Sequence, residues 1–211
     1  MKIEIWSDIM CPFCYIGKRH LETALKAFPE EQVEIEWKSF QLDPGIVPQP
    51  DKNVYEYLAE RKGMSVEDSK QMHAGVVARA AEVGLDYHFE KAVISNSFTA
   101  HRLIQLAKTK GFGDAMEETF FKAYFTDGKD LNDNATLMEL AVGAGLNALD
   151  VKEVLENEEL FSQAVNNDIG EAQQIGVRGV PFFVFDRKYA ISGAQPIEHF
   201  EETIQTVLNS K

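Results

Sequence analysis

The chain contains two cysteines, Cys11 and Cys14, and only Pro12 and Phe13 separate them. Two thiols at this spacing can close into a small disulfide ring, which is the chemistry of thiol–disulfide exchange. Cys11 would attack as the nucleophile, and Cys14 would then resolve the mixed disulfide and expel the substrate thiol. Pro12 and Phe13 would tune this exchange, because the residues between the cysteines set the local field around the thiolate.

The residues on either side of this CxxC pair predict a strand before it and a helix after it. The apolar segment 3–6 precedes the pair, and apolar residues at helical spacing follow it from Leu21 to Phe28. The first turn of a helix offers unpaired backbone N–H groups and a partial positive charge. Both favour thiolate over thiol at Cys11, and Pro12 suits a first turn, where no N–H needs a partner.

Three other interpretations of the pair are weaker. A structural zinc site needs four ligands, but the chain has no second cysteine pair, so we expect no metal. Its five histidines are dispersed at His20, His73, His88, His101 and His199. A disulfide across four residues would constrain the unfolded chain little. Two inert core cysteines would leave their placement at a strand–helix junction unexplained.

The bulk composition limits the partners. The formal net charge of −13 in 211 residues repels phosphate backbones and anionic membranes, so we expect neither nucleic-acid nor membrane binding. The strongest apolar run, 180–185, is far too short to span a bilayer. The first residues lack the apolar core of a signal peptide, which favours a cytoplasmic protein, where thiols are kept reduced. The sequence leaves the oligomeric state open between monomer and homodimer.

The order of predicted elements indicates the fold. The first forty residues suggest strand–helix–strand, with clean alternation over 33–37 in the second strand. A Pro-rich linker follows at 43–50, and the pattern is helical from 51 to about 149. A helix ending at Gly176, an apolar strand over 180–185, a second strand over 189–193 and a last helix complete the chain.

With the middle helices set aside, the order is β-α-β-α-β-β-α, which is the thioredoxin topology. We therefore predict an α/β protein with a thioredoxin fold and an all-α insertion after its second strand. The thioredoxin-like domain would be discontinuous, at 1–45 and 158–211, and the inserted helical domain would occupy 46–157. The CxxC pair would lie at the start of the first helix, where a thioredoxin fold presents it.

Val180-Pro181 precedes the apolar strand. Proline at the start of a buried strand lacks the N–H that a β-ladder uses, and a cis peptide bond is one common solution. We predict a cis bond here. By resemblance to thioredoxin-like folds, this loop would face the CxxC pair, and Val180 would offer backbone groups to an extended substrate.

Four blocks of sequence resemble DsbA-like proteins of the FrnE type. They are residues 8–19, which contain the CxxC pair, residues 96–103, residues 179–184 and residues 192–196. The same superfamily includes 2-hydroxychromene-2-carboxylate isomerase and kappa-class glutathione transferases, in which the first catalytic position is typically serine. Because both cysteines are present here, the resemblance implies dithiol chemistry with no cofactor, and with glutathione as a candidate co-substrate.

The resemblance implies an oxidoreductase that acts on protein or small-thiol disulfides. Asn96, Ser97 and His101 are candidates for the wall of its substrate groove. Against this, Asn96 or Ser97 could simply cap a helix, and His101 could be a partly buried helix residue.

Two further hypotheses remain. One is a glutathione-dependent isomerase or transferase acting on an aromatic compound. The other is a redox-sensitive adaptor protein that uses its acidic surface and helical insertion as an interface. The sequence determines neither the direction of the reaction nor the substrate.

Overall fold

The computed structural model describes residues 1–49 and 51–210. Pro50, the last residue of the predicted linker, and Lys211, the last residue of the predicted thioredoxin-like domain, lie outside the described residues. The secondary-structure elements are β1 (Lys2–Ser7), α1 (Pro12–Leu25), β2 (Glu34–Ser39), α2 (Val54–Lys62), α3 (Val66–Glu82), α4 (Phe98–Thr109), α5 (Gly113–Phe125), α6 (Asn134–Gly143), α7 (Ala148–Glu156), α8 (Ser162–Gln174), β3 (Phe182–Phe185), β4 (Tyr189–Ser192) and α9 (Ile197–Asn209).

The four-stranded sheet has the order β2-β1-β3-β4. β1 pairs in parallel with β2, which requires a crossover connection, and α1 provides it. β3 pairs antiparallel with both β1 and β4, and the pairing with β4 follows from the short turn between these two strands. β1 is buried along nearly its whole length because both neighbouring strands and the helices on either face cover it.

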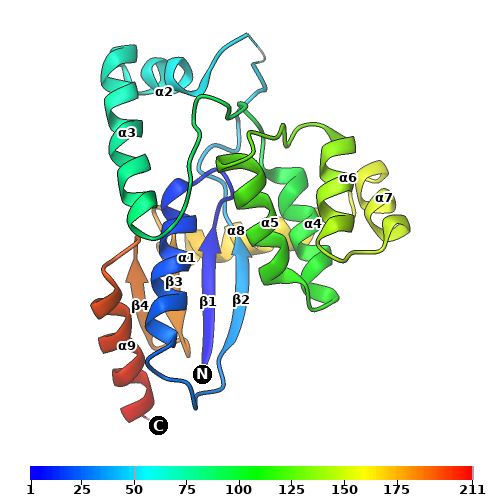
Figure 1. Ribbon diagram of the computed structural model, residues 1–211. Coiled ribbons are helices and arrows are strands. Elements are labelled where there is room, and N and C mark those ends of the chain that lie inside the picture. The colour runs from blue at the N-terminus through cyan, green and yellow to red at the C-terminus, as the bar shows by residue number, and fades with distance from the viewer. Residues whose placement is uncertain (50, 211) are drawn as a thin grey trace.

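The helices cover both faces of the sheet. α1 and α9 pack against each other on one face, and α8 packs against β2 on the other (Figure 1). The elements β1, α1, β2, α8, β3, β4 and α9 occur in the thioredoxin order, and α2 to α7 lie between β2 and α8. The predicted fold class is therefore confirmed, whereas the proposed domain boundaries stay a prediction.

The structure differs from the sequence analysis at three places. Residues 85–97 form no helix, because Gly84 follows the end of α3 with a φ of 78° and the next residues are irregular, with a turn at 89–91. The first helix ends at Leu25 rather than at Phe28, since its last turn tightens into i to i−3 hydrogen bonds. A further helix, α7, was missing from the predicted pattern.

Buried hydrogen bonds join the inserted helices to the sheet. Asp168 of α8 accepts hydrogen bonds from the Ser39 backbone N–H of β2 at 2.9 Å and from the Gln105 amide of α4 at 2.6 Å. Its backbone carbonyl also accepts the Trp6 indole N–H at 2.9 Å. Because these groups are buried, breaking their hydrogen bonds would cost free energy. The hydrogen bonds therefore fix α4 and α8 against β1 and β2. No helix in the described part of the chain has the length and hydropathy needed to cross a membrane.

Gly128 allows the irregular segment 85–97 to pack against the end of α5. Its φ is 64°, and a Cβ at this position would lie 2.4 Å from Lys91 Cβ and 2.8 Å from the Lys91 carbonyl oxygen. Gly63 has the same φ of 64° at the end of α2, but a Cβ there would meet nothing within 4 Å. Substitutions at these two glycines therefore distinguish the cost of backbone strain alone from the cost of strain with steric overlap.

We expect Gly128→Ala to destabilise the protein by roughly 2–4 kcal/mol, because it adds a steric overlap to the left-handed backbone strain. The matched change Gly63→Ala should cost only about 1–2 kcal/mol, from the strain alone. Urea unfolding of the two variants measures the difference. Equal losses of stability would contradict the close packing of Lys91 on Gly128.

Candidate active site

The two cysteines lie at the beginning of α1, and both are free thiols in the structure. Cys11 is the N-cap residue, and Cys14 lies within the first turn. The Cys11 backbone N–H donates to the Asp8 carbonyl at 2.8 Å, and the Cys11 thiol donates to the Val180 carbonyl at 3.4 Å. The Val180–Pro181 peptide bond is cis. The structure thus brings together the CxxC pair and the Val180-Pro181 dipeptide, which are far apart in the sequence.

Gly17 allows this close approach. It lies one turn beyond Cys14 in α1, and a Cβ there would lie 3.0 Å from the Pro181 ring and 3.1 Å from the Phe183 ring. A larger residue would push the Val180–Pro181 turn away from the helix. The absence of a side chain at Gly17 therefore allows the Val180–Pro181 turn to pack against α1.

The environments of the two thiols differ. Burial, followed by the hydrogen bond with Cys11 and the negative charge on that sulfur, raises the pKa of Cys14 well above its ordinary value. The Asp8 backbone and the Ser7 hydroxyl lower the pKa of Cys14 by a smaller amount. Cys11 lines a surface pocket, whereas Cys14 does not. Cys14 is therefore a protonated thiol, and of the two sulfur-bearing residues only Cys11, which is 3% exposed, lines the pocket.

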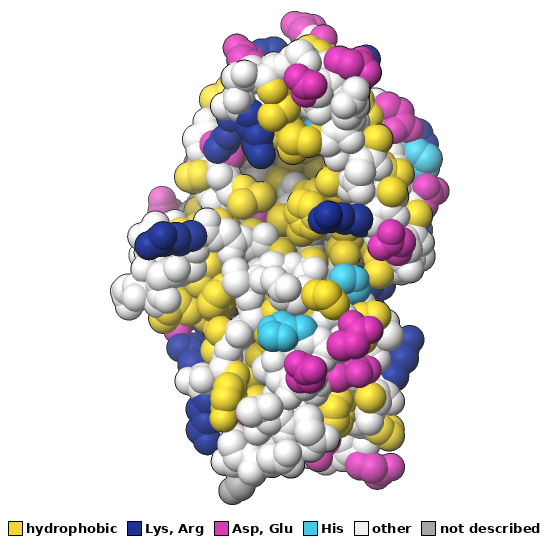
Figure 2. Space-filling view, turned by 90° about the vertical axis from the view of Figure 1, so that its left-hand side faces the viewer, with side chains coloured by type: hydrophobic (Ala, Val, Ile, Leu, Met, Phe, Trp, Pro, Cys, Tyr) yellow, Lys and Arg dark blue, Asp and Glu magenta, His cyan; other side chains and the backbone are white. Residues whose placement is uncertain are grey.

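The pocket beside Cys11 has a volume of about 460 Å³ and mainly apolar walls. Figure 2 shows this face with a hollow in which hydrophobic side chains gather and Lys or Arg side chains lie nearby. The walls come from the CxxC loop, the linker, α2, α3, the segment 85–97 and α5. The apolar side chains that line the pocket are Met10, Pro12, Phe13, Leu42, Ile46, Val54, Tyr57, Leu58, Met72, Val76, Phe89, Ile94, Tyr124, Phe125 and Val180.

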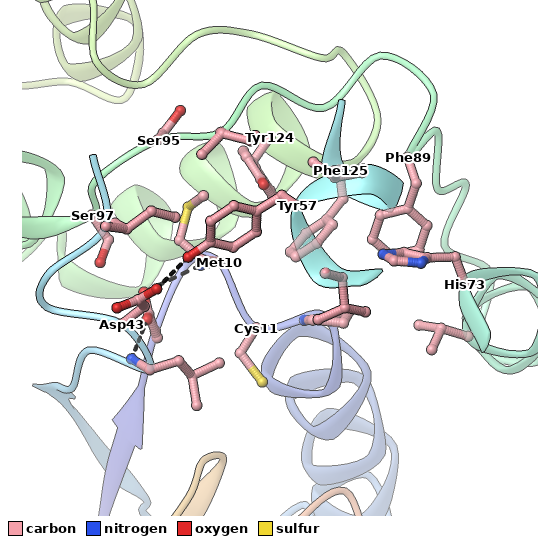
Figure 3. A pocket seen from close by; sticks show the side chains of 18 of the residues that line it. Met10, Cys11, Asp43, Tyr57, His73, Phe89, Ser95, Ser97, Tyr124 and Phe125 are labelled. Carbon is pink, nitrogen blue, oxygen red and sulfur yellow. Dashed lines mark hydrogen bonds between the residues drawn. The ribbon is translucent and has the colours of Figure 1, made fainter. Parts of the chain in front are cut away.

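Three polar side chains that contact one another lie at the mouth of the pocket. Arg61 of α2 forms an ion pair with Asp43 of the linker and donates a hydrogen bond to the Tyr57 hydroxyl at 3.0 Å. The Tyr57 hydroxyl in turn donates to Asp43, as Figure 3 shows. Lys62 is exposed beside Arg61. Burial is the main reason that the pKa of His73, farther along the wall, is lowered, so this side chain is neutral at pH 7.

Tyr87 was missed by the sequence analysis. Its hydroxyl donates to the Pro12 carbonyl at 2.8 Å, and its ring stacks on Tyr15 and Phe125. It therefore fixes the backbone between the two cysteines from the segment 85–97. The alternation of Leu85, Tyr87 and Phe89 is a signal for an extended buried segment, but it does not reveal the hydrogen-bond partner.

The three predicted wall residues occupy different places. Ser97 lines the pocket, whereas Asn96 and His101 do not. The Asn96 side chain accepts a hydrogen bond at 2.9 Å from the N–H of Phe98, the first residue of α4, whereas the N-cap residue, Ser97, makes no side-chain capping hydrogen bond. It also donates to the Ile46 carbonyl of the linker at 3.2 Å. His101 is fully buried behind the pocket rather than partly buried.

A buried polar cluster lies behind the CxxC loop, formed by Asp8, His101 and Glu117. The Asp8 carboxylate accepts the backbone N–H groups of Met10 at 3.2 Å and Leu42 at 2.8 Å. His101 Nε2 lies 3.5 Å from Asp8 Oδ1, which is ion-pair distance when the imidazole is protonated, and neither ring nitrogen has a hydrogen bond of good geometry among the described residues.

The pKa values of the cluster are shifted. Burial opposes protonation of His101, but the contact with Asp8 outweighs it and raises the pKa of His101. Glu117 of α5 is fully buried, and burial raises its pKa to about 8. Glu117 is therefore protonated at neutral pH. Within the described residues, no group of three or more His, Cys, Asp and Glu side chains is placed to hold a metal ion.

The raised pKa of Glu117 predicts how stability depends on pH. A carboxyl group with a pKa of about 8 in the folded protein and about 4.5 in the unfolded chain favours folding fully below pH 4.5. This contribution is lost as the pH rises through 8, by up to about 1.4 kcal/mol for each pH unit. We therefore expect Glu117→Gln to flatten the pH dependence of the unfolding free energy between pH 5 and 8.

Urea unfolding across that range measures the effect, and Glu118→Gln on the same helix is the control. Burial opposes ionisation of Glu118, but hydrogen bonds from Arg19 and Tyr15 outweigh it and lower its pKa, so this group stays ionised above pH 5. A wild-type pH dependence in Glu117→Gln would contradict the protonated state of Glu117.

Comparison with known proteins places this site in a family. A curated relative, the uncharacterized protein YwbO of Bacillus subtilis (strain 168), is 28% identical over 210 residues, which cover 96% of this chain and 94% of that protein. The crystal structure of the probable DsbA oxidoreductase SCO1869 from Streptomyces coelicolor is 41% identical, with a TM-score of 0.94. The match covers 100% of this chain and 91% of that one.

The cytosolic disulfide reductase DsbM from Pseudomonas aeruginosa has the same fold at 16% identity. Its TM-score is 0.69, with full coverage of both chains, and a structure of DsbM with GSH gives a TM-score of 0.67, covering 99% of this chain and all of that one. A family described as the DSBA-like thioredoxin domain matches residues 2–205, nearly the whole chain. The chain therefore belongs to the family of DsbA-like thioredoxin-domain proteins.

Proposed function

We propose that this protein is a thiol–disulfide oxidoreductase in which Cys11 is the nucleophile and Cys14 is the resolving thiol. The observation that carries this proposal is the asymmetry of the pair. Cys11 lines the pocket, whereas Cys14 lies behind it with a raised pKa. A substrate can form a mixed disulfide with the first sulfur without meeting the second.

The reaction proceeds in two exchanges. The Cys11 thiolate attacks one sulfur of a substrate disulfide, the substrate S–S bond breaks, and the other substrate sulfur leaves as a thiolate. Cys14 then loses its proton and attacks the Cys11 sulfur, which forms the Cys11–Cys14 disulfide and releases the second substrate thiolate. The net result is a reduced substrate and an oxidised enzyme, and the same steps in reverse oxidise a dithiol.

The Val180-Pro181 turn contributes to binding in this scheme. The Val180 carbonyl, which accepts the Cys11 thiol in the structure, becomes available to a substrate backbone N–H once the sulfur enters a mixed disulfide. Backbone pairing of this kind holds an extended segment without regard to its side chains. Recognition of side chains then falls to the pocket.

Replacing each cysteine separately tests the roles. We expect Cys11→Ser to lower disulfide-reductase activity about 100-fold or more, because no other thiol lines the pocket. Cys14→Ser should complete the first exchange and accumulate a mixed disulfide, which intact-protein mass spectrometry detects as an added mass. Full reductase activity in Cys11→Ser would overturn the proposal, as would failure of alkylating reagents to modify either thiol of the native protein.

The apolar pocket indicates the substrate class. Its volume of about 460 Å³ accommodates large apolar side chains beside the Cys11 sulfur. Burying one such side chain contributes about 1.5–3 kcal/mol. We therefore propose substrates that carry an aromatic or large aliphatic group close to the reacting disulfide. Lys62, which is exposed at the pocket and has no ion-pair partner among the described residues, favours an additional anionic group, a feature that glutathione disulfide also has.

Two adjacent valines of α3 allow a matched test of the pocket. Val76 is half-buried and lines the pocket, whereas Val77 is exposed and does not. The wild-type protein should form a mixed disulfide about tenfold or more faster with a peptide disulfide that has Phe beside its cysteine than with the Gly analogue. Val76→Asp should remove most of this preference, and Val77→Asp should retain it.

Stopped-flow kinetics with the two peptides measures the preference. Equal rates for the Phe and Gly peptides in the wild-type protein would contradict the proposed substrate class while leaving the exchange chemistry intact.

A further inference from the structure

Most polar side chains that line the pocket beside Cys11 already have hydrogen-bond partners within the protein. Two of them belong to the segment before α4. The Ser95 hydroxyl donates to the Val93 carbonyl at 3.0 Å, and the Ser97 hydroxyl accepts from the Gln41 amide at 3.4 Å. The paired polar side chains of the wall are Asp8, Asp43, Tyr57, Arg61, Ser95 and Ser97.

Tyr124 of α5 is different. Its side chain is only 6% exposed and lines the pocket, yet no group among the described residues forms a hydrogen bond with its hydroxyl. The oxygen is open to the cavity rather than sealed in the core, and Figure 3 shows it pointing toward Tyr57 and the interior of the pocket. The Tyr124 ring packs edge-to-face against Phe125, with 4.9 Å between the ring centroids, and this contact orients the hydroxyl.

The Tyr124 hydroxyl is a neutral group. Burial, followed by the negative charge of Asp8 and the field of Tyr57, raises the pKa of Tyr124 above its ordinary value. A neutral phenol can donate one hydrogen bond and accept another. The wall therefore presents a polar group that is almost buried and carries no charge.

A second neutral polar group lies farther along the wall. His73 Nδ1 is 2.7 Å from the Ser69 carbonyl oxygen, so Nδ1 carries the proton of the neutral ring and Nε2 is an acceptor. No hydrogen bond among the described residues reaches Nε2. The ring is held between Tyr55 and Phe89, with centroid distances of 4.9 Å and 4.6 Å.

These groups restrict the chemistry of the ligand. Solvent can pair with the Tyr124 hydroxyl while the pocket is empty, but a purely apolar side chain would expel that solvent and leave the hydroxyl unpaired. A charged group would be buried among neutral partners, which is more costly still. A hydroxyl is neutral, donates and accepts, and can therefore pair with either Tyr124 or His73.

We propose that the pocket binds the side chain of a tyrosine that lies beside the reacting cysteine of a substrate peptide, and that Tyr124 is the specificity-determining residue that recognises its hydroxyl. The inference rests on the function proposed above. The tyrosine ring fills the apolar part of the pocket, and its hydroxyl pairs with Tyr124. A free phenol has no sulfur, whereas a peptide disulfide brings the ring to the pocket through its bond to Cys11.

Three peptide disulfides that differ only in the residue beside the cysteine test the proposal. The residue is Tyr, Phe or Gly, so the first two differ by one hydroxyl. Below saturation, the wild-type protein should form the mixed disulfide about three- to tenfold faster with the Tyr peptide than with the Phe peptide, the factor that one neutral hydrogen bond supplies. Stopped-flow kinetics measures the three rates.

Tyr124→Phe should react equally fast with the Tyr and Phe peptides, because it removes the hydroxyl and keeps the ring. Tyr55→Phe is the matched control, since Tyr55 of α2 is half-buried and does not line the pocket. This variant should retain the wild-type preference for Tyr. The ratio of the Phe and Gly rates, measured in each variant, reports whether the apolar walls are intact.

The outcomes separate this inference from the function on which it rests. Equal Tyr and Phe rates in the wild-type protein would overturn the recognition of the hydroxyl and need no variant. A Tyr preference that survives in Tyr124→Phe, or that Tyr55→Phe loses to the same extent, would also overturn it. Each of these results leaves the exchange chemistry intact. Failure of the wild-type protein to form a mixed disulfide with any of the three peptides would overturn both proposals.

Discussion

The position of Cys11 depends on hydrogen bonds that reach its loop from three separate parts of the chain. Asp8 holds the loop from the end of β1, Tyr87 holds the Pro12 carbonyl from the inserted region, and the Val180 carbonyl faces the sulfur from the strand side. Each contact joins a backbone group to a partner in a fixed geometry. Together they fix the loop and hold the Cys11 sulfur in one position.

The helical insertion contributes to the chemistry because it controls the solvent around the sulfurs. The walls of the pocket come largely from α2, α3, α5 and the segment 85–97, and His101 and Glu117 also belong to the insertion. Hydrogen bonds between Gln105 and Asp168 fix this layer to the thioredoxin-like part. The insertion therefore forms most of the surface that surrounds Cys11.

The sequence predicted the parts of this site that local patterns encode. The CxxC pair, the strand–helix junction and the proline before β3 are each visible within a few residues, because turn and helix signals act over that distance. Tyr87, Arg61 and Glu117 were not predicted as site residues. Their roles come from contacts with residues that lie far away in the sequence, such as the 75-residue separation between Tyr87 and Pro12. His101 was named from its sequence block, but only packing shows that it faces Asp8 rather than the pocket.

The same burial that makes the site reactive also makes it costly. An unpaired Glu117, an incompletely paired His101 and a desolvated Cys14 each reduce the stability of the fold, and an inert core would replace them with apolar side chains. The apolar stacking of Tyr15, Tyr87, Phe121 and Phe125 lies beside them and offsets part of this cost. The aromatic packing around the loop thus stabilises the fold and compensates in part for the buried polar groups near the sulfurs.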